Sequence, residues 1–253
     1  MISKIEKNEY QKNGFLVLRQ VFSSALLSAI SEESAQMLER KDIIFPENIR
    51  CRWQNHIENG APILDAVDPV LDLCPSVSSL AFDSRLLEIL KYLLNESVYL
   101  FKDKFIFKPP GALGCATHQD YIAWPEFPKS FTTVLVAIDP ANRDNGCLSV
   151  YSGYHNMGLF SQNDGDYHDL PESLFDQKKQ VNLILEPGDI AIFGCYLPHG
   201  SAPNRTQFSR RHLYLSYNRS SDFGDRREEH YRQFYHWLKN RYAEYGCTNF
   251  IFK

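Results

Sequence analysis

The sequence lacks the features that attach a protein to a membrane or direct it into the secretory route. No apolar run approaches the ~18 residues that a membrane-spanning helix needs. Residues 1–9 contain acidic side chains and no apolar h-region, which argues against a signal or transit peptide. The six cysteines are scattered and include no Cys-x-x-Cys pair, a pattern typical of reduced thiols. We therefore expect a cytoplasmic protein with no membrane partner.

The sequence also has no block of like charge, no internal repeat and no low-complexity segment. Its 27 basic and 31 acidic residues leave a net charge of −4, so nucleic acid is not an expected partner. We expect a small-molecule substrate instead. Hydrophobic residues make up 43% and aromatic residues 13% of the 253 residues, which is ample for a packed core. We expect a single domain over residues 1–253, whose oligomeric state the composition does not determine.

Residues 1–96 predict an N-terminal cover that is mainly helical. Residues 14–18 form a short apolar run typical of a buried strand, and a serine cap precedes a helix that ends at about residue 39. Residues 42–76 contain several prolines and little periodicity, which predicts a long surface loop. Asp83 is placed to cap a second helix over residues 84–94, whose leucines form one apolar stripe.

Residues 97–218 predict the core of the fold. Short β-branched and aromatic runs alternate there with Gly, Pro and Asn-Gly turns, the pattern of an all-β sandwich or barrel. The predicted strands are residues 98–107, 131–138, 147–151, 181–185, 190–193 and 212–218. We expect a mainly β fold with covering helices, namely a double-stranded β-helix (jelly roll, cupin-like) that encloses a ligand. A closing amphipathic helix is expected over residues 226–245, and its inward-facing side chains are Phe234, Trp237, Leu238 and Tyr242.

A metal site is predicted by three side chains. His118 and Asp120 lie two residues apart, a spacing that puts both on one face of a β-strand. The best candidate for a third ligand is His199, which follows a strand-like apolar run. Two histidines and one carboxylate form the facial triad of non-haem Fe(II) oxygenases, which leaves metal positions open for a co-substrate and O₂. Two alternatives stay open: the first two residues form only a structural pair, or His155 replaces His199 as the third ligand.

An arginine extends this pattern, because the guanidinium of Arg210 offers the planar fork of donors that a dicarboxylate requires. At this point the chain resembles the phytanoyl-CoA dioxygenase family of Fe(II)/2-oxoglutarate-dependent oxygenases, over about residues 9–220. The matching segments are Gly-Phe-Leu-Val-Leu at 14–18, Lys-Pro-Pro at 108–110, His-Gln-Asp at 118–120, Asn-Gly-Cys-Leu at 145–148, Ser-Gly-Tyr-His at 152–155, Pro-Gly-Asp at 187–189, His-Gly-Ser at 199–201, and Arg210. The family's usual Pro-Gly-Ser-His reads Ser-Gly-Tyr-His here, which changes a turn and not a ligand.

The resemblance implies a cofactor and a reaction. It implies Fe(II) held by His118, Asp120 and His199, with 2-oxoglutarate and O₂ as co-substrates. It also implies that Arg210 pairs with the far carboxylate of 2-oxoglutarate, and that the Ser201 hydroxyl steadies this co-substrate. Decarboxylation of 2-oxoglutarate to succinate and CO₂ would then be coupled to hydroxylation of a C–H bond in a small metabolite.

The phase of the last predicted strand separates Arg210 from the adjacent Arg211. Arg210 shares parity with a polar set at positions 212, 214, 216 and 218. Arg211 shares parity with the more apolar residues Leu213, Leu215 and Tyr217. We therefore expect Arg210 to face the ligand cavity, and Arg211 to turn toward solvent or toward an acid of the closing helix.

Three lysines bear on the substrate. Lys102, Lys104 and Lys108 alternate along the strand predicted at residues 98–107 and just beyond it. One interpretation is a solvated edge strand protected by lysine. The other is a cationic pocket, in which Lys102 binds an anionic group of the substrate, such as a phosphonate or carboxylate, and Lys104 assists 2-oxoglutarate. Residues 216–222 are similar to family members that hydroxylate aminoalkylphosphonates, which favours the second interpretation.

Tyr121 and Trp124 follow the predicted metal ligands and either belong to the core or form the wall of the substrate pocket. Five further histidines have no expected role, namely His56, His168, His212, His230 and His236. Other classes of protein fit less well. A non-catalytic cupin-like binding protein needs no dicarboxylate-binding arginine, a zinc hydrolase needs a general-base motif that this sequence lacks, and a halogenase of this fold lacks the carboxylate ligand.

Overall fold

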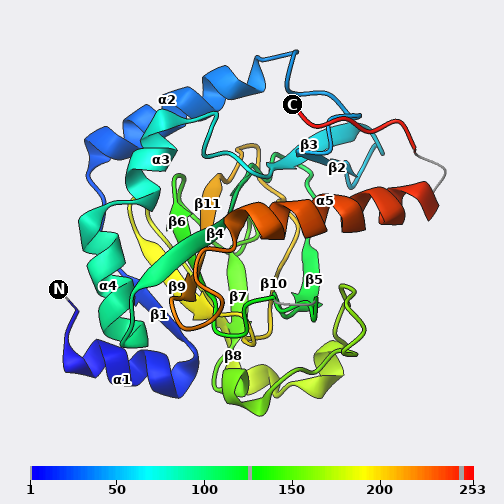
Figure 1. Cartoon of the computed structure of the whole chain (residues 1–253). Helices are drawn as coiled ribbons and strands as arrows, with labels where there is room; N and C mark the ends of the chain where they lie inside the picture. The colour runs from blue at the N-terminus through cyan, green and yellow to red at the C-terminus, as the bar shows by residue number, and fades with distance from the viewer. Residues whose placement is uncertain (1, 125–126, 245–247) are drawn as a thin grey trace.

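Two antiparallel β-sheets form the centre of the structure, a computed structural model that describes residues 2–124, 127–244 and 248–253 (Figure 1). The larger sheet has seven strands in the order β1 (Phe15–Leu18), β9 (Ile190–Gly194), β6 (Thr132–Ala137), β11 (His212–Arg219), β4 (Val98–Ile106), β3 (Pro62–Val67) and β2 (Cys51–Asn55). The smaller sheet has four strands in the order β5 (Cys115–His118), β10 (His199–Ser201), β7 (Leu148–Tyr151) and β8 (Gln180–Asn182). The predicted jelly roll is confirmed.

The two faces of the larger sheet bury different partners. Along β11, Leu213 and Leu215 belong to the core that the sheet shares with the covering helices. Tyr214, between them, belongs to the core between the two sheets, where it is joined by Leu148 of β7. This alternation confirms the predicted strand phase, since successive side chains of a strand point to opposite faces.

Helices cover the outer face of the larger sheet. In chain order the α-helices are α1 (Lys4–Asn13), α2 (Ser24–Leu38), α3 (Pro75–Ala81), α4 (Ser84–Leu94) and α5 (Arg227–Glu244), and the short 3₁₀ helices are Tyr154–Met157, Glu172–Leu174 and Gln177–Lys179. The Ser23 side chain caps α2 by accepting the Leu26 N–H, and Asp83 caps α4 by accepting the N–H groups of Arg85 and Leu86. The predicted helices at these two places are confirmed, whereas α1 was not predicted.

The prediction of one long loop over residues 42–76 is wrong. This segment contains β2 and β3, which extend the larger sheet beyond β4, and it leads into α3. Two of the prolines that suggested a loop lie at element ends: Pro62 is the first residue of β3 and Pro75 the first residue of α3. Proline is tolerated at these positions because its missing N–H is not needed there. The N-terminal segment thus supplies three strands as well as a helical cover.

The C-terminal helix α5 crosses β4 and lies over the mouth of the jelly roll (Figure 1). It is held there by Asp103 of β4, a fully buried carboxylate that forms an ion pair with Arg227. The Tyr231 hydroxyl donates to Asp68 and receives the Asp103 N–H, which adds a second attachment. The predicted helix is confirmed as far as residue 244, and Tyr245 lies outside the described residues. None of the helices in the described part of the chain is long and apolar enough to cross a membrane.

Candidate active site

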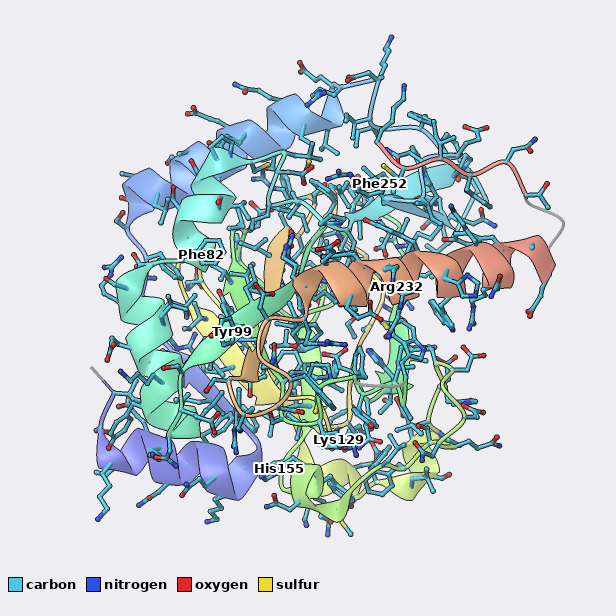
Figure 2. All side chains as sticks on the ribbon, in the orientation of Figure 1. Phe82, Tyr99, Lys129, His155, Arg232 and Phe252 are labelled. Carbon is cyan, nitrogen blue, oxygen red and sulfur yellow. The ribbon has the colours of Figure 1, made fainter. Side chains whose placement is uncertain are left out.

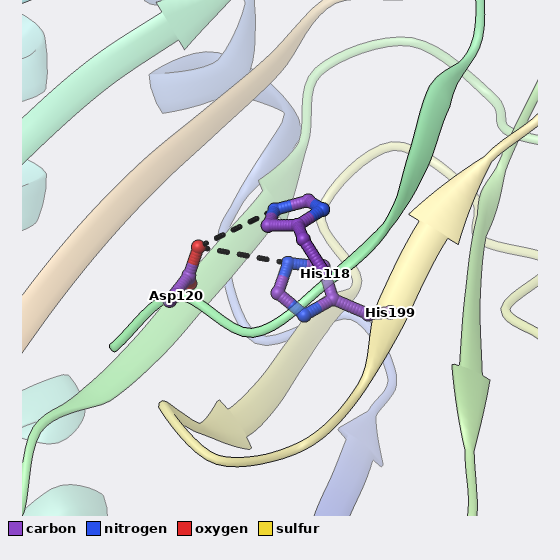
Figure 3. A group of neighbouring side chains, drawn as sticks. All are labelled: His118, Asp120 and His199. Carbon is purple, nitrogen blue, oxygen red and sulfur yellow. Dashed lines mark ion pairs between the residues drawn. The ribbon is translucent and has the colours of Figure 1, made fainter. Parts of the chain in front are cut away.

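Three predicted metal ligands meet at one end of the smaller sheet. β5 ends at His118, and β10 begins at His199, directly opposite it in the strand register. The Asp120 Oδ1 atom lies 3.7 Å from His118 Nε2 and 3.6 Å from His199 Nε2 (Figure 3). The two-residue spacing had suggested that Asp120 lies on the same strand as His118. In the structure Asp120 lies beyond the end of β5. The intervening Gln119 turns away and donates to the carbonyls of Gly158 and Tyr196.

The histidine rings are oriented by the backbone. Nδ1 of His118 lies 2.9 Å from the Ala116 carbonyl oxygen, and Nδ1 of His199 lies 2.9 Å from the Leu197 carbonyl oxygen. Since a carbonyl only accepts, each Nδ1 carries a hydrogen, and each Nε2 faces the space beside Asp120, where it can bind a metal. This donor set of two imidazoles and a carboxylate fits a divalent iron.

The electrostatics of His199 and Asp120 agree with metal binding. Burial and the neighbouring His118 lower the pKa of His199 to about 4. Burial would raise the pKa of Asp120, but the two imidazoles outweigh it and hold this pKa well below its usual range. His199 is therefore neutral and Asp120 ionised at neutral pH, the forms that bind a metal. Burial would lower the pKa of His118, but Cys115 and Asp120 outweigh it and raise this pKa to about 10, so a metal that binds here displaces a proton from His118. The ligand atoms lie within 4.8 Å of one another, and among the described residues no other group of three His, Cys, Asp or Glu does so.

His155 is not close to this site. It lies on the 3₁₀ segment Tyr154–Met157, near the end of α1 (Figure 2), and its Nε2 contacts the Gln11 carbonyl at 3.1 Å. The alternative that it supplies the third ligand is therefore excluded by its position.

A cationic group lies next to the triad in the same cavity, which measures about 420 Å³. Arg210 is 2% exposed, and one of its terminal nitrogens donates to Nδ1 of the buried His212. The Lys108 ammonium donates to the Ser201 hydroxyl at 2.9 Å. Arg210, Ser201 and Lys108 all line the cavity, and two cations with a hydroxyl suit a carboxylate. Arg210 Nε has no hydrogen-bond partner within the described residues, which leaves a buried donor for a ligand.

Lys108 is a site residue to which the sequence analysis assigned no co-substrate role. It appeared as one of three alternating lysines and in the Lys-Pro-Pro match, without a role of its own, whereas Lys104 was predicted to assist 2-oxoglutarate. In the structure Lys104 lies with its ammonium 5.1 Å from the ring centre of Tyr214, and Lys108 makes the contact with Ser201. Burial and the Arg210 charge lower the pKa of Lys108 to about 7. Its position next to the Pro-Pro segment was the available signal.

The lysine-rich strand is not a solvated edge. β4 lies between β11 and β3, and both Lys102 and Lys104 line the cavity. The Lys102 ammonium lies 3.5 Å from Asp68 Oδ2 and 4.5 Å from the ring centre of Phe234 on α5. The edge-strand interpretation is therefore wrong, and the cationic pocket is present.

Of the two aromatic candidates for the pocket wall, Tyr121 belongs to the core and Trp124 lines a cavity. Tyr121 packs with Phe127 in a buried aromatic cluster and is not among the residues that line either active-site cavity. Trp124 lines a small side cavity next to the lysines and donates its indole N–H to the Gly165 carbonyl at 2.8 Å.

Arg211 points to the helical side, where Asp139 binds it with two hydrogen bonds of 2.8 Å. The expectation that Arg211 faces solvent or an acid of the closing helix is wrong, because its partner follows β6.

Residues 10–212 match the sequence profile of the phytanoyl-CoA dioxygenase (PhyH) family. The chain belongs to this family. The 2-aminoethylphosphonate dioxygenase of uncultured bacterium HF130_AEPn_1 is 28% identical over 233 residues, which cover 90% of this chain and 85% of that protein. The methylphosphonate hydroxylase of Gimesia maris is 33% identical over 185 residues, which cover 71% of this chain and 68% of that protein.

A solved structure shares the fold of this dioxygenase. EctD from S. alaskensis with 2-oxoglutarate and 5-hydroxyectoine has a TM-score of 0.69 and 22% identity, over 87% of this chain and 77% of that chain. Together with the family membership and the His-Asp-His group, the relatives identify the reaction class: the protein is an Fe(II)- and 2-oxoglutarate-dependent dioxygenase that acts with O₂ on a small molecule. The predicted reaction class is confirmed, and the non-catalytic cupin-like alternative is wrong.

Proposed function

We propose that this dioxygenase hydroxylates a C–H bond of a small phosphonate. The observation that carries the proposal is the pair Lys102 and Lys104, which face the cavity next to the triad and lie on an interior strand. An anionic head group between two ammonium groups gains charge-assisted hydrogen bonds, which are strengthened in a cavity of low dielectric constant. Two relatives named for phosphonate substrates support the same class of anion.

The proposed division of roles follows from the geometry of the cavity. His118, Asp120 and His199 would hold Fe(II), which supplies the chemistry that couples decarboxylation of 2-oxoglutarate to oxidation of a C–H bond. The Ala116 and Leu197 carbonyls keep both imidazoles in the metal-binding tautomer.

The co-substrate and the substrate are proposed to occupy different sides of the triad. Arg210, Ser201 and Lys108 would bind the far carboxylate of 2-oxoglutarate, with Lys104 between this group and Lys102. Phe234 and Trp237 of α5 line the cavity at its mouth and would exclude water from the bound substrate.

We further propose that the N-terminal cover, the jelly roll and α5 act as one catalytic domain in a reducing compartment such as the cytoplasm. β1 pairs with β9, and α5 is tied to β4 through Asp103, so all three parts attach to the same sheet. The cysteines of the described residues are free, and Cys51, Cys74, Cys147 and Cys195 are buried. Cys247 lies outside the described residues.

The test is substrate-dependent succinate formation by the purified protein with Fe(II), 2-oxoglutarate and ascorbate. Methylphosphonate and 2-aminoethylphosphonate are compared with ethanol and ethylamine, which carry similar carbon groups without the anion. We expect succinate release only with the phosphonates, and a new phosphorus resonance from the hydroxylated product. Equal succinate release with and without the phosphonate group would contradict the proposed substrate class.

A further inference from the structure

A second, smaller cavity of about 40 Å³ adjoins the main one on the side of the lysines. It shares Lys102, Lys104 and Asp120 with the main cavity, and its far wall includes His230 of α5. The volume is several times the ~10–15 Å³ that one water molecule needs. The cavity therefore has room for a compact polar group next to the metal ligands.

His230 is a buried polar side chain without a partner. It is 4% exposed, and neither Nδ1 nor Nε2 has a hydrogen-bond partner within the described residues. Buried polar groups are nearly always hydrogen-bonded, because an unpaired one loses its bonds to water without compensation. Aromatic rings fix its place: Phe234 stacks on it at 5.8 Å between ring centres, and Phe101 meets it edge-on at 5.1 Å.

The other neutral polar side chains of this small cavity already have partners. The Thr133 hydroxyl lies 3.2 Å from Asp120 Oδ2 and 3.0 Å from the Ser216 hydroxyl. Burial and the charge of Lys102 hold the pKa of His230 well below its usual range, so the ring is neutral and offers one N–H donor. Of the cavity-lining groups, His230 is thus the neutral donor that a ligand would satisfy.

A β-bulge places Lys102 beside this histidine. In the pairing of β4 with β11, Ser216 faces Lys102 and the next residue, Tyr217, faces Leu100, so Phe101 is left without a partner. Two consecutive side chains, Phe101 and Lys102, consequently line the same cavity. The ammonium and the imidazole are thereby brought to one small space from β4 and α5.

We infer that His230 is a substrate-specificity residue, which donates a hydrogen bond to the anionic head group held between Lys102 and Lys104. This inference rests on the proposed function and extends it to a residue outside the segment that matches the family profile, which ends at residue 212. Lys102 and Lys104 supply positive charge on one side of the anionic head group, and the His230 imidazole supplies a hydrogen-bond donor on the other. Substrate selection is thus shared between the jelly roll and the C-terminal helix.

The experiment compares His230→Phe with His236→Phe. Phenylalanine keeps the ring stacking of His230 and removes its donor. His236 is an exposed histidine of the same helix, and its Nε2 lies 3.1 Å from the Asn240 amide nitrogen. Methylphosphonate is titrated calorimetrically into protein loaded anaerobically with Fe(II) and 2-oxoglutarate, and KM and kcat are measured in air. We expect His230→Phe to weaken methylphosphonate binding by about 10- to 100-fold, the usual effect of a lost hydrogen bond to a charged group.

The matched outcomes separate this inference from its alternatives. His236→Phe and the affinity for 2-oxoglutarate should remain unchanged, and His230→Asn or His230→Gln, whose amide nitrogens replace Nδ1 or Nε2, should recover binding. Equal methylphosphonate affinity in both phenylalanine variants would show that the cavity holds only water and would overturn the inference. A parallel loss of 2-oxoglutarate affinity, or no recovery in either amide variant, would overturn it too. Wild-type protein that binds no phosphonate would instead refute the proposed function, before any variant is compared.

Discussion

The Lys108 ammonium donates a hydrogen bond of 2.9 Å to the Ser201 hydroxyl, across the cavity that also contains Arg210. Lys108 follows the interior strand β4, and Ser201 ends β10 of the other sheet. The contact therefore joins the two sheets at the point where a dicarboxylate would bind. Because burial lowers the pKa of Lys108 to about 7, this bridge changes its charge near neutral pH.

The affinity for 2-oxoglutarate should fall as the pH rises through about 7. Below this pH Lys108 is charged and attracts the far carboxylate, and above it the lysine is neutral. A bound carboxylate favours the charged form, so binding takes up a proton. Anaerobic titration of the Fe(II) protein with 2-oxoglutarate between pH 6 and 8.5 measures this slope. Lys108→Met should bind 2-oxoglutarate more weakly and lose most of the pH dependence of this affinity. Lys129→Met, at an exposed lysine, is the control and should behave as the wild type. An unchanged pH dependence in Lys108→Met would refute the assignment.

The lowered pKa of Lys108 also affects the stability of the ligand-free protein, which should rise with pH where the affinity for 2-oxoglutarate falls. The pKa of Lys108 is lowered from its model-peptide value of 10.5, so the unfolded chain binds more protons than the folded one between about pH 7 and 10.5. The contribution of Lys108 to the free energy of unfolding therefore rises with pH over this window. Lys108→Met should be more stable than the wild type at pH 7, with a difference that disappears toward pH 10.5. Urea unfolding at several pH values measures it.

Replacing Arg210 and Arg211 should have separate effects. Arg210→Ala removes a buried charge partner and should weaken 2-oxoglutarate binding by about 30- to 1,000-fold. Arg211→Ala should change this affinity by less than about tenfold. It should instead lower the free energy of unfolding by about 1–3 kcal/mol, because Arg211 and Asp139 form a half-buried bidentate pair. If the larger loss of affinity occurs in the Arg211 variant, the assignment of the co-substrate site is refuted.

Removal of one triad residue should abolish turnover without unfolding the protein. His199→Ala leaves two ligands and should lose tight Fe(II) binding together with substrate-dependent succinate formation. His236→Ala, on the exposed side of α5, should behave as the wild type. Metal analysis after anaerobic loading and desalting provides a readout that does not depend on turnover. Normal iron content and activity in His199→Ala would exclude this residue as a ligand.

Lys102→Met should raise the KM for a phosphonate by more than it raises the KM for 2-oxoglutarate. The methionine keeps the packing on Phe234 and removes the charge that faces the cavity. Loss of one charge-assisted hydrogen bond corresponds to about a 10- to 100-fold change. Steady-state kinetics with each substrate varied in turn measure both constants. An equal rise in both would indicate a general disturbance of the cavity and not an anion site.

Local patterns in the sequence were sufficient to predict two capped helices, the triad and the strands other than β2, β3, β5 and β10. Alternation along a strand is a short-range property, so the parity that separates Arg210 from Arg211 could be read from the residues alone. Serine and aspartate caps act within one helical turn, which explains why α2 and α4 were predicted. The motif around His118 needed one distant partner, His199, and the strand pattern placed both at strand ends.

Properties that depend on strand order and long-range contact were decided only by the tertiary structure. β4 is an interior strand because β3, from a segment that looked like a loop, pairs with its last residues, Phe105 and Ile106. Lys108 has a positive φ of 35°, an uncommon conformation for a residue before proline, and the Asn204 amide and the Arg210 N–H hold its carbonyl.

The cavity at His230 depends on tertiary structure for the same reason. His230 and Phe234 are one turn apart on an amphipathic helix, a pattern that by itself predicts only an inward face. Their place over the triad results from the ion pair between Arg227 and Asp103, and from a bulge that turns Phe101 toward the helix side of the cavity. Nothing within a short window of sequence encodes either contact, since each joins residues far apart in the chain.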